Sequence, residues 1–340
     1  MKRFLISPFR PCGSLDLLLR ANIMADDFAA RAWRDWLRMR SIEDATWLEV
    51  RLLTPLGRRL GTIDPHSPLR PRLEGLVKSQ WVRTQLMMQD SVSALDALRS
   101  ANIDYLLVKE AAYYAEGLGA ATRRIMGDVD ILVLPEAVVA ANDRLCETGW
   151  SSKRGYSPER LRHRAQFGIC DVAYLKGEFG EVDLHFQIYY FTRRTPELEA
   201  SLWKKARTAR FAGRSVLVPS LEESIVSGIA DGIRSGEGDW AIDVSHRVSA
   251  CQIDWDETVS IAVQRGIVPS VLSGLSYLKS LGCKIPQSTL DGLHDASSTL
   301  GEWLKYWDHR LQRPGVPWKF RAGVQRVAHS LLPQEKYQYG

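Results

Sequence analysis

Two aspartates stand one residue apart at the start of an apolar run, in Gly127–Leu134. In a β-strand the side chains alternate between two faces, so Asp128 and Asp130 share one face and the apolar residues between them face a core. Two carboxylates on one face of a strand end form a hard-oxygen site of the kind that holds Mg²⁺ against a phosphate chain. The alternative is a strand turn with two solvated aspartates, and this stretch alone leaves both interpretations open.

A third carboxylate, Asp183, falls in an alternating run over residues 181–190, in which Asp183 and His185 share the face opposite to the apolar residues. An extended run over residues 167–175 precedes it, and the glycine-containing stretch 176–180 between the two predicts a β-hairpin. An antiparallel hairpin placed beside the strand of the first two aspartates would bring the third carboxylate to the same end of the sheet.

The order of the expected helices and strands around these side chains predicts an α+β fold. Its small mixed sheet is flanked by helical N- and C-terminal regions. We expect a poorly ordered extension over residues 1–25, for which an upstream start codon would account. A helical region over residues 26–100, a sheet-containing core over 101–218 and a second helical region over 219–340 follow.

Within these regions, glycines and prolines predict a loop over residues 61–71. The expected elements of the core are a strand over residues 103–108, a helix over 111–118, a loop over 117–122, the aspartate strand, a helix over 135–148, the hairpin and a strand over 216–219. Six further helices are expected over residues 221–235, 239–251, 255–265, 268–282, 288–296 and 299–311.

The composition is that of a soluble globular protein, with 45% apolar and 25% charged residues among 340. The net charge of +5 allows anionic ligands without demanding nucleic acid. Five scattered cysteines without a Cys-x-x-Cys pair fit neither a disulfide framework nor a zinc site, and they indicate a cytoplasmic protein. We expect neither a membrane span nor a signal peptide, because Pro8, Arg10 and Pro11 interrupt the weakly signal-like N-terminus.

A cluster of basic residues lies between the aspartate strand and the hairpin. It has two interpretations: a solvated loop and helix face, or a patch that meets phosphate or an acidic acceptor. Its members are Lys153, Arg154, Arg160, Arg162, His163 and Arg164.

In order, the motifs are a strand ending Leu-Val-Lys109-Glu110, then Arg123, then Gly-Asp-Val-Asp-Ile-Leu-Val, then Glu-Val-Asp-Leu-His-Phe. This order resembles the uncharacterised nucleotidyltransferase family of the polymerase-beta-type superfamily. The pattern of that family is Leu-Lys-Gly, then Arg, then Asp-x-Asp-Leu-Leu-Val, then Asp-Leu-His. The motifs cover about residues 103–190, and the helical regions on both sides are also similar.

The resemblance implies an enzyme that transfers a nucleoside monophosphate from a nucleoside triphosphate, such as ATP, to a hydroxyl-bearing acceptor. It further implies that Asp128, Asp130 and Asp183 ligate Mg²⁺ or Mn²⁺, or that Asp183 takes the proton of the attacking hydroxyl. The acceptor is left open between a small molecule, a peptide natural product, a protein side chain and an RNA end.

Cations ahead of the aspartates are implied to hold the phosphates: Lys109 as a point charge, Arg123 as a planar fork, and Arg124 as a further candidate. Lys109 also fits a snorkelling lysine at a strand end, and Arg123 could pair with the aspartates when no metal is bound. His185 is implied either to orient Asp183 or to touch the substrate, with a purely structural role as the alternative.

One position departs from the family pattern, because Glu110 stands where the pattern has glycine. Glu110 points away from the site, or adds a metal ligand, or marks an altered nucleotide site. Three alternatives to an active transferase stay open. They are a degenerate member that binds a nucleotide or partner, an RNA-modifying toxin-like protein that holds phosphates with its basic cluster, and an interaction scaffold.

Overall fold

A computed structural model describes residues 11, 13–166, 171–189, 195–296, 298–300, 302, 303 and 306. The chain divides into two compact units. The first takes the described residues up to Gly75 and those from Leu221 onward, and the second takes those from Leu76 to Ser220. Most of the long helix α5 (Arg70–Ser100) therefore belongs with the sheet, whereas the sequence placed residues 26–100 in a separate helical region.

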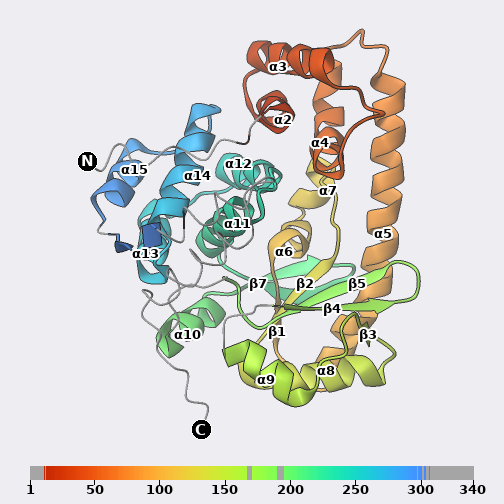
Figure 1. Cartoon of the computed structure of the whole chain (residues 1–340), viewed down its shortest axis with the longest axis vertical. Helices are drawn as coiled ribbons and strands as arrows, with labels where there is room; N and C mark the ends of the chain where they lie inside the picture. Colours follow the sequence, from red (N-terminus) through yellow and green to blue (C-terminus); the bar gives the residue numbers. More distant parts are fainter. Residues whose placement is uncertain are drawn as a thin grey trace, which may run out of the picture. The chain divides into compact units, whose positions relative to one another are not determined.

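A seven-stranded mixed sheet with strand order β3-β4-β5-β2-β1-β7-β6 forms the centre of the second unit (Figure 1). Strand β2 pairs antiparallel with β1 and parallel with β5, and β4 forms an antiparallel hairpin with β5. The α+β class and the hairpin beside the aspartate strand are thus confirmed. The strands are β1 (Tyr105–Leu107), β2 (Val129–Val133), β3 (Ser151–Ser152), β4 (Asp171–Lys176), β5 (Gly180–His185), β6 (Arg207–Phe211) and β7 (Arg214–Val218).

One face of this sheet forms the hydrophobic core of the second unit. Val129, Ile131 and Val133 of β2 are buried in it, because alternate strand residues point to the same face. Four helices add buried residues to the same cluster, namely α5, α6 (Lys109–Ala115), α8 (Val138–Glu147) and α9 (Pro158–Gln166). The same alternation turns the carboxylates of β2 and β5 to the other face.

Three elements of the second unit differ from the prediction. The loop expected over residues 117–122 is wrong, because residues 118–122 form α7 (Leu118–Thr122), in which Gly119 lies against the ring of Tyr114. Helix α10 (Pro196–Lys204) and strand β6 were not predicted. Phe211 is the one fully buried residue of β6, and Arg207, Thr208 and Arg210 are polar, so this edge strand lacks the apolar residues that identify a strand in the sequence.

Helices make up the first unit. The poorly ordered extension is wrong for residues 14–23, which form α2, with Leu18 and Leu19 buried and Asp16 accepting a hydrogen bond from the Tyr277 hydroxyl (2.9 Å). The helices are α2 (Ser14–Ile23), α3 (Asp26–Met39), α4 (Trp47–Ile63), α11 (Leu221–Ser235), α12 (Trp240–Ala250), α13 (Trp255–Arg265), α14 (Val268–Ser280) and α15 (Gln287–Asp295).

The loop before α5 is shorter than expected. Helix α4 continues to Ile63 and α5 begins at Arg70, with Pro71 in its first turn, where a proline costs no hydrogen bond. Residues 167–170 of the first hairpin run and most of the helix predicted over residues 299–311 lie outside the described residues. None of the described helices is long and apolar enough to cross a membrane.

Candidate active site

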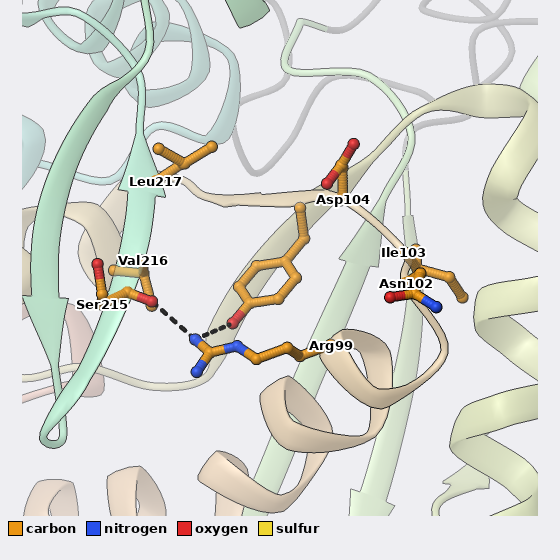
Figure 2. A pocket seen from close by; sticks show the side chains of 8 residues that line it. Arg99, Asn102, Ile103, Asp104, Ser215, Val216 and Leu217 are labelled. Atoms are coloured by element: carbon orange, nitrogen blue, oxygen red, sulfur yellow. Dashed lines mark hydrogen bonds between the residues drawn. The ribbon is translucent and has the colours of Figure 1, made fainter.

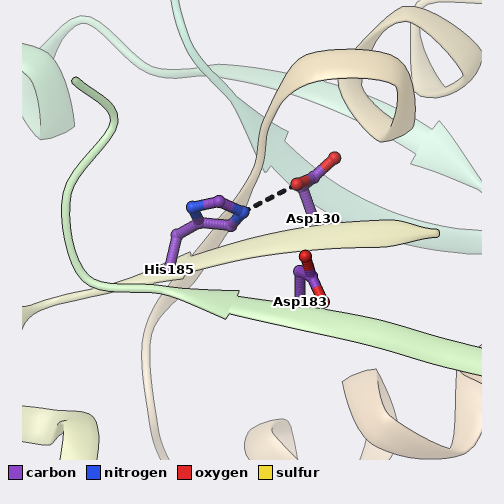
Figure 3. A group of neighbouring side chains, drawn as sticks. All are labelled: Asp130, Asp183 and His185. Atoms are coloured by element: carbon purple, nitrogen blue, oxygen red, sulfur yellow. Dashed lines mark hydrogen bonds and ion pairs between the residues drawn. The ribbon is translucent and has the colours of Figure 1, made fainter. Parts of the chain in front are cut away.

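Three aspartates meet on the face of the sheet opposite the hydrophobic core. Asp130 of β2 and Asp183 of β5 are register partners on neighbouring parallel strands, and Asp128 lies directly before β2. Figure 3 shows Asp130 and Asp183 close together, with His185 of β5 joined to Asp130. The register follows from the period of two on both strands, which places a buried aliphatic residue between the polar ones.

Two overlapping groups of side chains have the donor atoms of a cation site. Asp130, Asp183 and His185 each offer one ligand atom within 4.8 Å of the others, and so do Glu110, Asp128 and Asp130. Asp130 belongs to both groups. Carboxylate oxygens predominate, and these are the ligands that Mg²⁺ and Mn²⁺ prefer.

Asp130 and His185 are the most enclosed of these residues, each with 1% of its surface exposed. The Asp130 carboxylate has two close partners. Its Oδ1 atom contacts His185 Nε2 (2.7 Å) and Lys109 Nζ (2.9 Å). Within the described part of the chain, its Oδ2 atom and Asp183 Oδ1 are buried without a hydrogen-bond partner. A buried carboxylate oxygen without a donor is costly, so these two atoms fit a site that binds a cation.

Crowding of like charges changes the acidity of the cluster. Burial raises the pKa of Asp128 well above its ordinary value, the charges of Asp130, Asp183 and Glu110 raise it further, and Lys109 opposes them. Burial and the neighbouring Asp130 also raise the pKa of Asp183 to about 6. A bound cation would relieve this repulsion, which is a second reason why the donor set fits a divalent metal.

A pH-dependent stability follows from Asp183. Because its pKa is higher in the fold (about 6) than its ordinary value of 3.8, folding favours the protonated acid. The resulting stabilisation is complete below pH 3.8 and is lost as the pH rises through about 6. In EDTA, we expect Asp183→Asn to melt at a higher temperature than wild type at pH 7 and the gap to close towards pH 4. Thermal melts at several pH values measure this gap, and parallel curves would contradict the prediction.

Lys109 comes to the cluster from the first residue of α6, directly after β1. Its backbone has a φ of 51°, in the left-handed region. The preceding residue, Val108, donates its backbone N–H to the Asp130 carbonyl oxygen (3.1 Å), so the end of β1 is held against the aspartate strand. The sequence left open whether Lys109 binds phosphate or only ends a strand, and in the structure its ammonium group neutralises Asp130.

The two arginines before β2 have different surroundings. Arg124 is 2% exposed, and its guanidinium donates to Glu110 Oε1 (2.8 Å) and the Ile125 carbonyl (2.6 Å), while the Tyr114 hydroxyl donates to the Arg124 carbonyl. The guanidinium of Arg124 is therefore held by Glu110 and the backbone, and its role as a phosphate ligand stays a prediction. Arg123 ends α7 with a φ of 56° and an exposed side chain, and it does not pair with the aspartates as one alternative required.

Glu110 does not point away from the site. One of its oxygens belongs to the donor group with Asp128 and Asp130, and Oε1 binds Arg124. One further residue near the carboxylates, Asp171, was missed by the sequence reasoning, and its charge raises the pKa of Asp183. Lys153 of the basic cluster also lies near them, because the charges of Asp183 and Asp128 act on it. Alternation along β4 could have indicated Asp171, which pairs in register with His185.

A cavity of about 300 Å³ lies elsewhere in the second unit, between the end of α5, β1 and β7 (Figure 2). Arg99 crosses it and donates to the Ser215 carbonyl (2.7 Å) and the Tyr105 hydroxyl (3.4 Å). Tyr105 begins β1, whereas the carboxylates lie past its other end, where Leu107 pairs with Ile131. The cavity is therefore separate from the carboxylate cluster.

The model of a protein family described as "uncharacterised nucleotidyltransferase" matches residues 49–282, which include all the side chains of both donor groups. The chain belongs to this nucleotidyltransferase family. The resemblance of the motifs to this family is thereby confirmed.

A crystal structure of an antigenic nucleotidyltransferase-like protein from Paracoccidioides brasiliensis is similar at 18% identity, over 64% of this chain and 94% of that one. Its TM-score of 0.33 is too low to support a statement about fold or site. Among curated proteins, no sequence matches the chain with significance.

Proposed function

We propose that the protein is a divalent-metal-dependent nucleotidyltransferase that transfers a nucleoside monophosphate from a nucleoside triphosphate to an acceptor hydroxyl. The observation that carries the proposal is the pair of register partners Asp130 and Asp183, each with a buried carboxylate oxygen that lacks a partner among the described residues. Membership of a nucleotidyltransferase family supports this use of the pair.

Asp128, Asp130 and Asp183 would hold the metal ion, with Glu110 within reach. A bound Mg²⁺ supplies electrostatic stabilisation of the charge that develops at the α-phosphate. Asp183, whose pKa is about 6, is mostly ionised at neutral pH and is suited to accept the proton of the acceptor hydroxyl. His185 would act on Asp130, which its Nε2 contacts, and not on Asp183 as the motif suggested.

Phosphate binding falls to Lys109 and Arg123. Lys109 is already at the cluster, 2.9 Å from Asp130, and Arg123 is exposed and precedes Asp128 by five residues in the chain. Both carry the positive charge that a triphosphate requires, and Arg123 adds a planar fork that can bind two phosphate oxygens. The proposal also includes a cytoplasmic location. The assay described next identifies the base of the nucleotide and the acceptor.

The test is transfer of label from each of four nucleoside triphosphates, labelled at the α-phosphate, to pools of RNA, peptides and small molecules. We expect one nucleotide to label a product in the presence of Mg²⁺ and none to do so in EDTA. Calorimetric titration with each Mg²⁺–nucleotide accompanies the assay. No binding at millimolar nucleotide would exclude the transferase.

A second candidate is a nucleotide-binding protein without transfer activity. Glu110 favours it, because a glutamate adds bulk and negative charge where the family pattern has glycine and where backbone N–H groups would otherwise approach the phosphates. Here calorimetry would detect the nucleotide, and no labelled product would form with any acceptor pool. The two measurements together therefore separate binding from catalysis.

A further inference from the structure

A largely exposed basic segment, residues 153–164, follows β3 and includes most of α9 in the second unit. It starts beside the carboxylates, because the Lys153 backbone N–H donates to the carbonyl of Ala173, the register partner of Asp183 (2.9 Å). Lys153 Nζ binds Glu181 (2.5 Å), which precedes Asp183 by two residues on the same face of β5. The hydrogen bond to Glu181 raises the pKa of Lys153, and the charges of Asp183 and Asp128 raise it further.

The charges of the basic segment are unbalanced. Glu159 is its single acidic residue. Arg154, Arg160 and Arg162 are exposed, and the charge of Arg162 acts on Glu159, three residues before it. A solvated helix face usually alternates its charges so that opposite ones meet three or four residues apart. Beyond the pair of Glu159 and Arg162, this segment presents a surplus of cations next to the proposed site of phosphate transfer.

Three of the cations lie around the side chain of Tyr156. The guanidinium groups of Arg160 and Arg164 lie 5.0 Å and 4.6 Å from the centre of its ring, and Arg154 donates to its hydroxyl (3.3 Å). Cations collected around one ring repel one another, and a bound anion would relieve that repulsion. Guanidinium planes beside an aromatic ring also offer stacking surfaces to nucleobases, which a simple phosphate-binding loop does not provide.

From this geometry we propose that the acceptor is a single-stranded RNA, bound through its phosphates to the basic segment. The inference rests on the proposed transferase function. In the transfer, an RNA hydroxyl oxygen forms a bond to the α-phosphorus, the bond from that phosphorus to the bridging oxygen of the β-phosphate breaks, and pyrophosphate leaves. The proton of the hydroxyl passes to the Asp183 carboxylate. A strand of repeated phosphates and bases matches a row of cations and one aromatic ring better than a small anion, which two or three cations would hold.

The test measures binding of a fluorescein-labelled single-stranded RNA of about 20 nucleotides by fluorescence anisotropy over a range of salt concentrations. The variant Arg154→Ala/Arg160→Ala/Arg162→Ala removes three cations and keeps Arg164, which donates to the Asp171 carbonyl (2.7 Å). We expect the variant to bind RNA at least about tenfold more weakly and to reduce the slope of log K against log salt by about two.

The matched control is Arg31→Ala/Arg34→Ala/Arg38→Ala, which removes three exposed arginines from α3 and should bind RNA as wild type does. Thermal melts verify that both variants are folded.

Equal RNA affinity of the two variants overturns the acceptor assignment. If wild type still binds Mg²⁺–nucleotide in that case, the transferase proposal stays intact. Absence of Mg²⁺–nucleotide binding by wild type overturns the transferase, and the acceptor assignment with it. A poly-glutamate peptide that displaces RNA at equal charge concentration also overturns the RNA assignment, in favour of an acidic protein.

Discussion

Asp130→Asn is expected to lower nucleotidyl transfer by more than about a thousandfold, because a metal site contributes several kcal/mol to the transition state and about 1.4 kcal/mol is a factor of ten. Asp130 is the one residue common to both donor groups, so its loss removes a ligand from each. Asparagine keeps the shape of the side chain and removes its charge. The change therefore tests the carboxylate and not the packing around it.

Calorimetry with Mn²⁺ gives a readout of the same variant that does not depend on the unknown acceptor. We expect the Mn²⁺ affinity of wild type to disappear in Asp130→Asn and to persist in Asp104→Asn, which removes the same charge from an exposed position beside the separate cavity. Transfer within tenfold of wild type in a folded Asp130→Asn protein would remove this residue from the mechanism.

Gly180→Ala is expected to have the second-largest effect, on both stability and transfer. A Cβ atom at Gly180 would lie 2.4 Å from the Lys176 carbonyl oxygen and 3.1 Å from the Trp150 ring. The carbonyl belongs to the backbone of the same hairpin, with Lys176 opposite Gly180 in the register, so the strands must shift to make room. We expect a loss of about 1–3 kcal/mol of stability.

The shift would reach Asp183, which follows Gly180 by three residues on β5. Displacement of a catalytic group by about 1 Å can cost a factor of about a hundred in rate, so transfer should fall by that order. Gly75→Ala in α5 is the matched control, because its Cβ would meet nothing within 4 Å and alanine favours helix. Chemical denaturation and label transfer measure both variants. Unchanged stability of Gly180→Ala would show that the hairpin relaxes at no cost.

The carboxylate cluster could be predicted from sequence because it depends on local rules. Alternation along the two strands places Asp128 with Asp130 and Asp183 with His185, and the family pattern indicates that the strands are neighbours. The motif order also places Lys109 at the end of β1. These relations need only the period of a strand and the length of a turn, and the structure shows them as contacts between Lys109, His185 and Asp130.

Other features depend on tertiary contacts that the sequence does not display. Arg124 resembles a phosphate ligand until the fold buries its guanidinium against Glu110. Helix α2 resembles a loose extension until the helices around it cover Leu18 and Leu19. The mostly polar strand β6 is held by its antiparallel pairing with β7 and not by an apolar pattern.

Position 109 meets two opposed demands. A φ of 51° suits glycine best, and for a residue with a Cβ this region costs about 1–3 kcal/mol. Glycine there would relax the backbone and leave Asp130 buried without the ammonium group 2.9 Å away. Lysine occupies this position, so the structure combines a strained backbone at residue 109 with an ion pair that neutralises the buried Asp130 carboxylate. An apolar side chain at position 109 would keep the backbone strain and lose the positive charge. Glycine, which the dihedral angle favours, would lose the positive charge as well.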